Sequence, residues 1–254
     1  MIIGIIPSRY ASTRFPGKPL ADILGKSMIQ RVYEQASQAK CLSKVVVATE
    51  DQRIVDHVKS FGGHVVMTSP DHFSGTERVF EAYELIKGVE SESINLEQDY
   101  IINIQGDEPF LVAEQINELG TILDGKVEIA SQIIPCSDNA ILFDEREAKV
   151  IVNTNQEAIY FSRHVLPYFK GIPQEEWHKH HTYYRQVGMY AYRADILKKI
   201  TQLPVSGLET AESLEQLRWI ENGYKIKMAL TKYESHCIDT FEDIGMILDM
   251  LGLH

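Results

Sequence analysis

Short apolar segments alternate with amphipathic segments along the first half of the chain. Residues 2–6 are Ile-Ile-Gly-Ile-Ile, a continuous apolar run that is typical of a parallel strand buried on both faces. Similar runs predict strands at 44–49, 64–67 and 100–104. Between them, the spacing of apolar positions predicts helices behind a Ser27–Gln30 capping box, from Asp51 to Gly62, and over 76–86. Strands that alternate with helices in this way predict a parallel sheet with helices on both faces.

The second half of the chain is less regular. Residues 184–192 alternate between apolar and polar, which is typical of an antiparallel strand. The other elements predicted here are strands at 128–134, 150–153 and 225–230, and helices at 209–222 and 241–251. Polar stretches at 69–75, 88–99 and 171–182 predict surface connections. No repeat or linker divides the chain, so residues 1–254 are predicted to form one α/β domain. We expect a Rossmann-like, doubly wound, mainly parallel sheet with an inserted antiparallel portion.

Composition excludes several classes of protein. The 254 residues are 44% hydrophobic and 24% charged, as in ordinary globular domains. No apolar run approaches the ~20 residues of a membrane span, and no charged leader precedes a secretory segment, so we expect a cytoplasmic protein. Cys41, Cys136 and Cys237 are scattered and form no C-x-x-C pair, which favours reduced thiols over disulfides or a zinc site.

The distribution of charge indicates a ligand. A formal net charge of −11 disfavours binding to nucleic acid or to an anionic membrane. Residues 1–21 nevertheless contain three basic residues, Arg9, Arg14 and Lys18, and no acidic residue. The first acidic residue of the chain is Asp22. A local basic segment in an acidic protein suggests a small anionic ligand.

The basic segment is a loop that follows the first predicted strand. Ligands of open α/β sheets bind at the carboxyl ends of the strands, so this loop, over residues 7–19, lies where a ligand is expected. Its basic and hydroxyl side chains and its backbone N–H groups suit a polyphosphate. It is not a P-loop, because Leu20 stands where that motif needs a glycine before Gly25-Lys26-Ser27. A merely solvated basic loop is the alternative.

Two aspartates follow predicted strands. Asp107 comes directly after the strand at 100–104, and Asp239, in His236-Cys-Ile-Asp-Thr240, ends another expected short strand. Two carboxylates beside a triphosphate would repel it, by roughly 3 kcal/mol for each pair of charges ~6 Å apart at an effective dielectric constant of ~20. A divalent cation removes this conflict, and Mg²⁺ prefers carboxylate and phosphate oxygens. The alternative is that each aspartate only caps the next helix.

Other chemistries have weaker support. The chain has no G-x-S-x-G elbow for a hydrolase triad. The histidines at 178, 180 and 181 lie in a polar loop without helical metal-ligand spacing and are expected to be solvated. The glutamates at 209, 212 and 215 are expected on a solvated helix face, where one of them could meet a substrate. Leu214, Leu217, Trp219 and Ile220 are expected in the core.

Seven motifs in the same order resemble one enzyme family. They are Ile-Pro-Ser-Arg-Tyr-Ala-Ser-Thr-Arg-Phe-Pro-Gly-Lys-Pro-Leu (6–20), Val-Ala-Thr-Glu-Asp (47–51), Ser-Gly-Thr-Glu-Arg (74–78), Gln-Gly-Asp-Glu-Pro (105–109), Tyr-Phe-Ser-Arg (160–163), Leu-Glu-Gln-Leu-Arg (214–218) and Asp-Thr (239–240). Together they resemble the 3-deoxy-manno-octulosonate (Kdo) cytidylyltransferases, or CMP-Kdo synthetases. The resemblance implies a nucleotide-diphospho-sugar transferase-like fold, a homodimer, and a Mg²⁺-dependent reaction of CTP with Kdo. The products would be pyrophosphate and CMP-Kdo, which feeds lipopolysaccharide assembly in Gram-negative bacteria.

The resemblance also implies roles for individual residues. Those implied for the nucleotide are Pro7, Arg9, Arg14, Lys18, Ser74 and Gln105, with Arg14 and Lys18 also catalytic. Asp107 and Asp239 would be catalytic and hold Mg²⁺. The sugar-side candidates are Arg78, Gln105, Arg163, Gln186, Tyr190 and Glu212, with Arg163 expected to pair with the sugar carboxylate.

One position departs from the family pattern. Gln186 stands before Val187-Gly188-Met189-Tyr190, where the family usually has histidine. Glutamine forms hydrogen bonds but does not titrate near neutral pH, so the sugar could be a close variant of Kdo. Two other classes remain open, a glycosyltransferase that uses a nucleotide sugar and a nucleotide-binding protein without activity.

Overall fold

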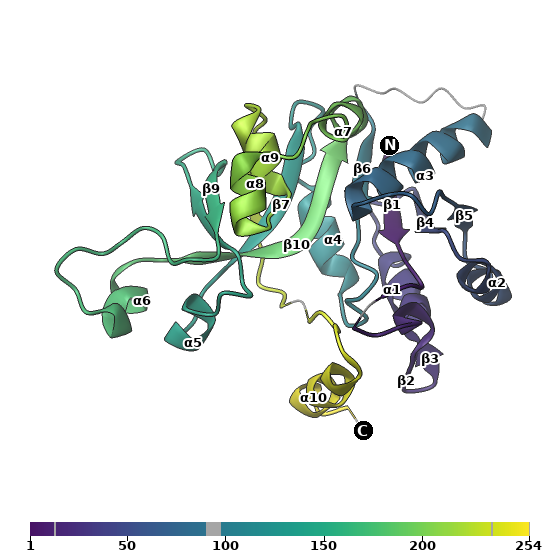
Figure 1. Ribbon diagram of the computed structural model, residues 1–254, viewed down its shortest axis with the longest axis horizontal. Helices are drawn as coiled ribbons and strands as arrows, with labels where there is room; N and C mark the ends of the chain where they lie inside the picture. Colours follow the sequence, from purple (N-terminus) through teal and green to yellow (C-terminus); the bar gives the residue numbers. More distant parts are fainter. Residues whose placement is uncertain (13, 90–97, 235, 254) are drawn as a thin grey trace.

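The computed structural model describes residues 1–12, 14–89, 98–234 and 236–253, and a mixed sheet forms its centre (Figure 1). The nine strands of this sheet are β1 (Ile2–Pro7), β4 (Lys44–Thr49), β5 (Val65–Met67), β6 (Tyr100–Asn103), β7 (Ile129–Pro135), β8 (Lys149–Val152), β9 (Ala158–Ser162), β10 (Tyr184–Arg193) and β11 (Ile226–Leu230). Their main order is β11-β7-β10-β6-β1-β4-β5, and β8 and β9 extend from β10. A separate hairpin consists of β2 (Asp22–Ile23) and β3 (Lys26–Ser27).

Strand β1 lies inside the sheet and is parallel to both of its neighbours, β4 and β6. Ile3 and Ile5 point into one hydrophobic core, whereas Ile6 belongs to a second core on the opposite face. A continuous apolar run therefore forms this strand because both of its faces are buried. The predicted doubly wound, mainly parallel sheet is confirmed.

Helices cover both faces of the sheet. One core is formed with residues of α3 (Gly75–Val89), α7 (Ala194–Ile200) and α9 (Gln216–Glu221), and the other with residues of α1 (Met28–Ala36), α2 (Gln52–Ser60) and α4 (Ala113–Gly120). Ser27 and Asp51 cap α1 and α2 as predicted. The side chain of Gln30 donates to Glu34, so only the Ser27 half of the predicted capping box forms.

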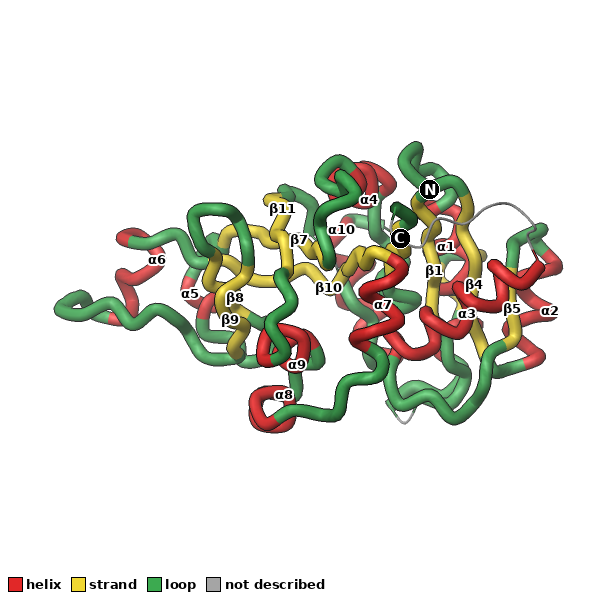
Figure 2. The backbone as a smooth tube through the Cα atoms, turned by 90° about the horizontal axis from the view of Figure 1, so that it is seen from above, coloured by secondary structure: helices red, strands yellow, loops and turns green. Residues whose placement is uncertain are grey.

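The antiparallel portion is inserted between parallel strands. Strand β10 is antiparallel to β6, β7 and β8, and β8 pairs with β9 in the same sense. Beyond these strands the chain projects away from α2 toward the opposite end of the molecule (Figures 1 and 2). This projection carries α5 (Asn139–Leu142), η2 (Gln174–Glu176) and α6 (Trp177–His180), where Trp177 is buried in a small core. The connection expected over 171–182 is therefore partly helical.

The prediction of one continuous helix at 209–222 is wrong, although most of these residues are helical. The chain forms two short helices instead, α8 (Gly207–Glu212) and α9, separated at Ser213, which has a φ of 52°. The break turns Glu212 toward Ser162 on β9, and it leaves Glu215 free to accept a hydrogen bond from Thr76 on α3. Two glutamates thus form hydrogen bonds with two other elements, and the helix between them is interrupted.

Several elements were not predicted from the sequence. Helices α4 and α7 and strand β9 are short, and their apolar positions are too few for a clear period. The connection predicted over 88–99 lies mostly outside the described residues.

The last helix is α10 (Phe241–Leu251), preceded by Asp239. It begins with a capping box between Thr240 and Asp243 and packs with Ile23, Met28 and Ile238 in a third core. This packing brings the C-terminal segment beside the β2–β3 hairpin. Within the described part of the chain, no helix has both the length and the apolar character needed to cross a bilayer.

Candidate functional site

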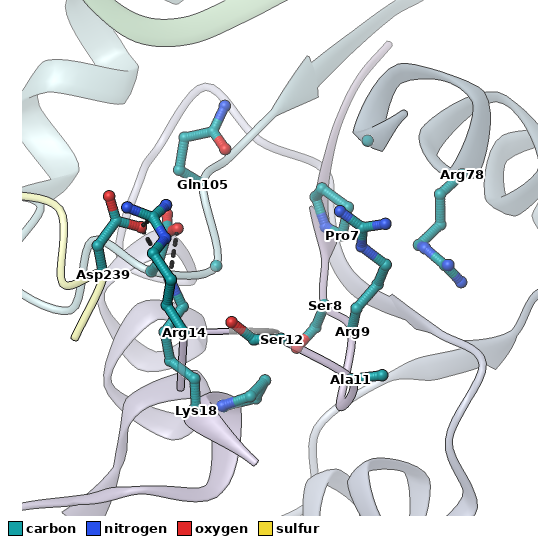
Figure 3. A pocket seen from close by; sticks show the side chains of 14 residues that line it. Pro7, Ser8, Arg9, Ala11, Ser12, Arg14, Lys18, Arg78, Gln105 and Asp239 are labelled. Carbon is teal, nitrogen blue, oxygen red and sulfur yellow. Dashed lines mark hydrogen bonds and ion pairs between the residues drawn. The ribbon is translucent and has the colours of Figure 1, made fainter. Parts of the chain in front are cut away.

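A cavity of about 450 Å³ opens at the carboxyl ends of β1 and β6 (Figure 3). Four segments that are distant in the sequence supply its lining: the first loop, the start of α3, the turn after β6 and the segment before α10. The lining residues are Pro7, Ser8, Arg9, Ala11, Ser12, Arg14, Lys18, Pro19, Gly75, Arg78, Gln105, Gly106, Asp107 and Asp239. The cavity lies where open α/β sheets bind their ligands.

The backbone of the first loop is shaped by Gly17, which has a φ of 73°. A Cβ atom at this position would lie 3.1 Å from the hydroxyl oxygen of Tyr10, and the Gly17 N–H donates to the carbonyl of Tyr10 at 3.0 Å. Glycine allows this turn because it adopts positive φ without a steric penalty. The turn leads into η1 (Lys18–Leu20), where Pro19 is buried and the ammonium of Lys18 reaches the cavity.

Gly106 allows the first loop and the turn after β6 to approach each other. A Cβ atom on Gly106 would lie only 2.8 Å from the carbonyl oxygen of Pro7. This contact is too close for any other residue without a backbone shift. The next residue, Asp107, therefore emerges directly beside the first loop.

Two cations and two carboxylates meet at this point. The Lys18 ammonium donates to Asp107 Oδ2 at 2.8 Å and lies 3.5 Å from Asp239 Oδ1. Arg14 Nη2 lies 3.0 Å from the same oxygen of Asp239. Burial opposes the charge on Lys18, but the carboxylates of Asp107 and Asp239 outweigh this effect and raise the pKa of Lys18. The structure thus brings together all four residues for which we expected catalytic roles.

Cys237 also lies in this group, although its sequence position gave it no expected role. Ile238 N–H donates to the carbonyl of Asp107 at 2.9 Å, and the side chain of Ile238 is buried in the third core. In an extended segment, alternate side chains share a face, so Cys237 and Asp239 both point toward Asp107. One donor atom from each of these three residues lies within 4.8 Å of the others. The two-residue spacing of Cys237 and Asp239 was the available signal.

The donor set of this group suits a hard cation. Partial desolvation and the neighbouring carboxylates of Asp107 and Asp239 raise the pKa of the Cys237 thiol, which favours its neutral form. The two carboxylates are the oxygen ligands that Mg²⁺ prefers, with water or phosphate completing its shell. Asp107 and Asp239 therefore fit Mg²⁺, and the neutral thiol adds nothing to its binding.

Arg9 is the third cation of the loop and lines the cavity beside Pro7 (Figure 3). Its side chain is exposed, and no hydrogen bond or ion pair holds its guanidinium among the residues that the structure describes. Unlike Arg14 and Lys18, it therefore needs no exchange of partners to meet an anion.

Arg78 was expected on the sugar side, but its charge already has a partner. The side chain is 1% exposed and its Nη1 lies 3.0 Å from Glu50 Oε2 and 2.6 Å from the Thr68 hydroxyl. These contacts join α3 to the ends of β4 and β5 and form one wall of the cavity. Ser74, on the same segment, accepts a hydrogen bond from the Glu77 N–H at the start of α3.

Gln186 and Tyr190 do not line the cavity and contact each other instead. The amide nitrogen of Gln186 donates to the Tyr190 hydroxyl and, at 3.3 Å, to Ser131 Oγ. Its carbonyl oxygen accepts from Gln216 at 2.8 Å. Burial raises the pKa of Tyr190, so that its hydroxyl stays protonated. Gln105 lines the cavity and donates to the Gly188 carbonyl at 2.7 Å. It therefore links the strand that carries Gln186 and Tyr190 to the cavity.

Arg163 and Glu212 line a separate cavity of about 330 Å³. Arg163 donates to backbone carbonyls, from Nε to Glu212 at 2.7 Å and from Nη1 to Glu145 at 3.0 Å. Glu212 accepts from the Ser162 hydroxyl at 2.8 Å and from the Arg163 N–H at 2.9 Å. Burial alone would raise the pKa of Glu212, but these hydrogen bonds outweigh it and lower the pKa. The pair joins α8 to β9 and to the turn before β8.

The other two glutamates that we expected on a solvated face also have internal partners. Glu209 caps α8 and forms an ion pair with Arg218 at 2.5 Å. Glu215 accepts from the Thr76 hydroxyl at 2.7 Å, and burial raises its pKa. The expectation of a solvated face is therefore wrong for all three glutamates. The expected core residues Leu217 and Trp219 are buried, and Leu214 and Ile220 pack against them in partly buried positions.

Comparisons with known proteins agree with this geometry. Residues 3–226 match the cytidylyltransferase family. The chain is 54% identical, over 98% of both chains, to a 3-deoxy-manno-octulosonate cytidylyltransferase of Parabacteroides distasonis. It is 42% identical, over 94% of both, to an 8-amino-3,8-dideoxy-manno-octulosonate cytidylyltransferase of Shewanella frigidimarina. A solved structure of CMP:2-keto-3-deoxy-manno-octonic acid synthetase complexed with CTP matches 99% of this chain and 98% of that one, with 38% identity and a TM-score of 0.86.

Proposed function

This chain belongs to the 3-deoxy-manno-octulosonate cytidylyltransferase family, and we propose that it couples CTP to Kdo to give CMP-Kdo and pyrophosphate. The observation that carries the proposal is the cavity at the strand ends, where Lys18, Arg14, Asp107 and Asp239 meet. A glycosyltransferase would not need so basic a loop, and a binding protein would not need both aspartates.

The first loop is proposed to hold the triphosphate. Arg9 is unpaired among the described residues, and Arg14 is 65% exposed, so both guanidinium groups can reach phosphate oxygens. Lys18 comes from a fixed turn and adds a point charge. Charge-assisted hydrogen bonds of this kind contribute roughly 1.5–3 kcal/mol each. Pro7, Ser74 and Gln105 are proposed to lie along the nucleoside, since they line the cavity or flank a residue that does.

Asp107 and Asp239 are proposed to hold Mg²⁺, for the reasons of donor chemistry given above. When bound, Mg²⁺ supplies charge stabilisation on phosphate oxygens and lowers the pKa of an oxygen that it coordinates. The protein fixes the positions of the two carboxylates, because the turn at Gly106 holds Asp107 and the packing of Ile238 holds Asp239.

The proposed reaction is a direct displacement. The anomeric hydroxyl of the sugar loses its proton to water and forms a bond to the α-phosphorus. The bond from this phosphorus to the bridging oxygen breaks, and pyrophosphate leaves with the negative charge. Lys18 and Arg14 stabilise the departing group, and in-line positioning supplies much of the remaining acceleration. The reaction needs no covalent nucleophile, and among the described residues that line the cavity, Ser8 and Ser12 carry the hydroxyl side chains.

The acid sugar is proposed to bind between Gln105 and the second-half strands. Arg163 remains the proposed partner of its carboxylate because an arginine fork matches a carboxylate. To act in this way, Arg163 must exchange backbone carbonyls for the substrate. Gln186, Tyr190 and Glu212 are proposed to support this side through their hydrogen bonds, and Arg78 through the cavity wall.

The decisive experiment is pyrophosphate release from CTP with purified protein. We expect release with Kdo and Mg²⁺ and none without sugar. Kdo should be compared with its 8-amino analogue, because a relative that is 42% identical is named for that sugar. A clear preference for the analogue would change the assigned sugar and leave cytidylyl transfer in place. Binding of CTP without release in the presence of either sugar would contradict the proposed reaction.

The setting of the reaction is also proposed. Supply of CMP-Kdo places the protein in lipopolysaccharide biosynthesis and in the cytoplasm, where CTP is available. We propose a homodimer, supported by the projection beyond β8, which leaves Tyr168 70% exposed and Phe143 39% exposed. Sedimentation at micromolar concentration should give twice the 28.9 kDa chain mass, and a monomer at all concentrations would contradict the dimer.

A further inference from the structure

The carboxylates proposed to hold Mg²⁺ already bind a cation of the protein itself. The Lys18 ammonium donates to Asp107 Oδ2 at 2.8 Å and to the Ile238 carbonyl at 2.7 Å, and it lies 3.5 Å from Asp239 Oδ1. Three oxygens thus surround one positive charge. Arg14 adds a second positive charge, 3.0 Å from the same oxygen of Asp239. Two positive charges therefore cancel the two negative charges of the pair.

This arrangement opposes a divalent cation in the free protein. The Lys18 side chain is only 13% exposed, so water screens its charge weakly. A divalent cation on Asp107 and Asp239 would stand beside this ammonium and compete for the same oxygens. To admit the metal, Lys18 must first lose hydrogen bonds to a carboxylate and a carbonyl. The cavity lining that the structure describes holds no other anion to replace them.

A triphosphate changes this balance. Its oxygens offer new partners to the ammonium of Lys18 and the guanidinium of Arg14. Only side chains need to move, because Gly17 and the buried Pro19 fix the backbone on both sides of Lys18. Once these cations turn to the phosphates, Asp107 and Asp239 are left as an uncompensated pair.

We propose that Lys18 and Arg14 are internal counter-ions, which exclude Mg²⁺ from the free protein and release the aspartates when the nucleotide binds. The proposal rests on the proposed function, because CTP and Mg²⁺ are the ligands of that reaction. It gives the two residues a role in the order of binding, so that metal enters this pair of carboxylates with the nucleotide or after it. Arg9, which has no such partner among the described residues, takes no part in this exchange.

The test is a calorimetric titration of the nucleotide-free protein with Mg²⁺ alone. Lys18→Met keeps the length and apolar stem of the side chain and removes the charge. We expect this variant to bind Mg²⁺ at least about tenfold more tightly than the unaltered protein. Arg14→Met should give a smaller gain, and Asp107→Asn in the Lys18→Met background should abolish the gain. Lys26→Met is the matched control, since it removes a lysine paired with Glu34 on the surface and should leave Mg²⁺ affinity unchanged.

Unchanged or weaker Mg²⁺ binding in both Lys18→Met and Arg14→Met would overturn the proposal. If Lys18→Met does not fold, Arg14→Met decides alone, because its side chain is 65% exposed and we expect its loss to leave the fold unchanged. The pyrophosphate assay separates the two ideas. If the variants bind Mg²⁺ more tightly but the unaltered protein does not transfer cytidylyl groups, the counter-ion proposal is supported and the proposed reaction is wrong. If the unaltered protein is active but neither variant binds Mg²⁺ more tightly, the counter-ion proposal is wrong and the proposed function stands.

Discussion

Asp107 and Asp239 are held differently by the fold. Asp107 follows a buried strand and is fixed by the close approach at Gly106, whereas Asp239 lies outside the sheet on a segment held by Ile238 and α10. Their carboxylates converge only because these two supports meet at the cavity. Either residue can therefore be changed without removing the support of the other.

We predict that Asp107→Asn and Asp239→Asn each lower turnover by at least ~100-fold, the scale on which loss of one catalytic electrostatic contact acts. Pyrophosphate release at limiting Mg²⁺ is the measurement, and circular dichroism should show an unchanged fold. Asp56→Asn, at an exposed position of α2, is the control and should keep full activity. Near-normal turnover of either cavity variant would remove that residue from the metal site.

The first loop should distinguish CTP from CMP. We predict that Arg9→Ala, Arg14→Ala and Lys18→Ala each weaken CTP binding about tenfold or more, since each loses a charge-assisted bond to the triphosphate. CMP binding, measured by the same calorimetry, should change much less. Arg146→Ala, on the exposed turn before β8, is the control. Equal losses for CTP and CMP would place these side chains at the nucleoside end or show that they act through folding.

At the scale of elements, the α8–α9 break is the clearest case of strain. Ser213 has a φ of 52°, in the left-handed region that costs residues other than glycine roughly 1 kcal/mol. Its side chain is exposed, so little packing is lost when it is removed. We predict that Ser213→Gly raises the free energy of unfolding by about 0.5–1 kcal/mol in urea titrations. Ser213→Val should lower it, because a β-branched side chain is less tolerant of positive φ.

Arg163 connects three elements through backbone carbonyls. Because these side-chain contacts join α8 and the end of β9 to the turn before β8, we predict that Arg163→Ala lowers the free energy of unfolding by roughly 1–3 kcal/mol. It should also raise the sugar KM or lower kcat while CTP affinity, measured by calorimetry, stays nearly intact, since CTP is proposed to bind in the other cavity. Arg163→Lys keeps the charge but not the fork. A loss of stability without any effect on sugar kinetics would make Arg163 structural alone.

At the scale of the whole molecule, Glu215 joins the two halves of the chain. It comes from the second half and accepts from Thr76 on α3, which begins at the edge of the nucleotide cavity. Burial raises the pKa of Glu215, so the folded state binds its proton more tightly than the unfolded state does. Its contribution to stability is therefore fully present below the unfolded pKa and is lost as the pH rises through the folded pKa.

We predict that Glu215→Gln removes this pH dependence, because glutamine does not titrate. The stability of the variant minus that of the unaltered protein should grow as the pH rises from about 4.5 and level off above the folded pKa of Glu215. Urea unfolding across this range measures the difference. Glu114→Gln, on the exposed side of α4, is the control. A difference that does not change with pH would show that Glu215 does not titrate in this window.

Local pattern was sufficient for most strands of the sheet and for α1, α2, α3 and α10, but not for α4, α7 or β9. An amphipathic helix leaves a period of 3.6 residues and a half-buried strand a period of two, which predicted α1 and β10. A strand buried on both faces leaves a short apolar run, which predicted β1 and β4. Motif order was sufficient for the family, and the position of the basic loop after β1 indicated the ligand end of the sheet. All of these signals lie within short stretches of neighbouring residues.

Contacts between distant residues leave no such period. Lys18 bonds Asp107 across 89 positions and the Ile238 carbonyl across 220, and no local pattern indicated that these groups would cancel each other's charges. The break at Ser213 and the inward partners of Glu212, Glu215 and Gln186 arise in the same way, from hydrogen bonds to other elements. The local sequence therefore identified the residues that could carry the chemistry. Their partners in the folded protein depend on packing, because buried polar groups bind whatever donor or acceptor the fold brings within reach.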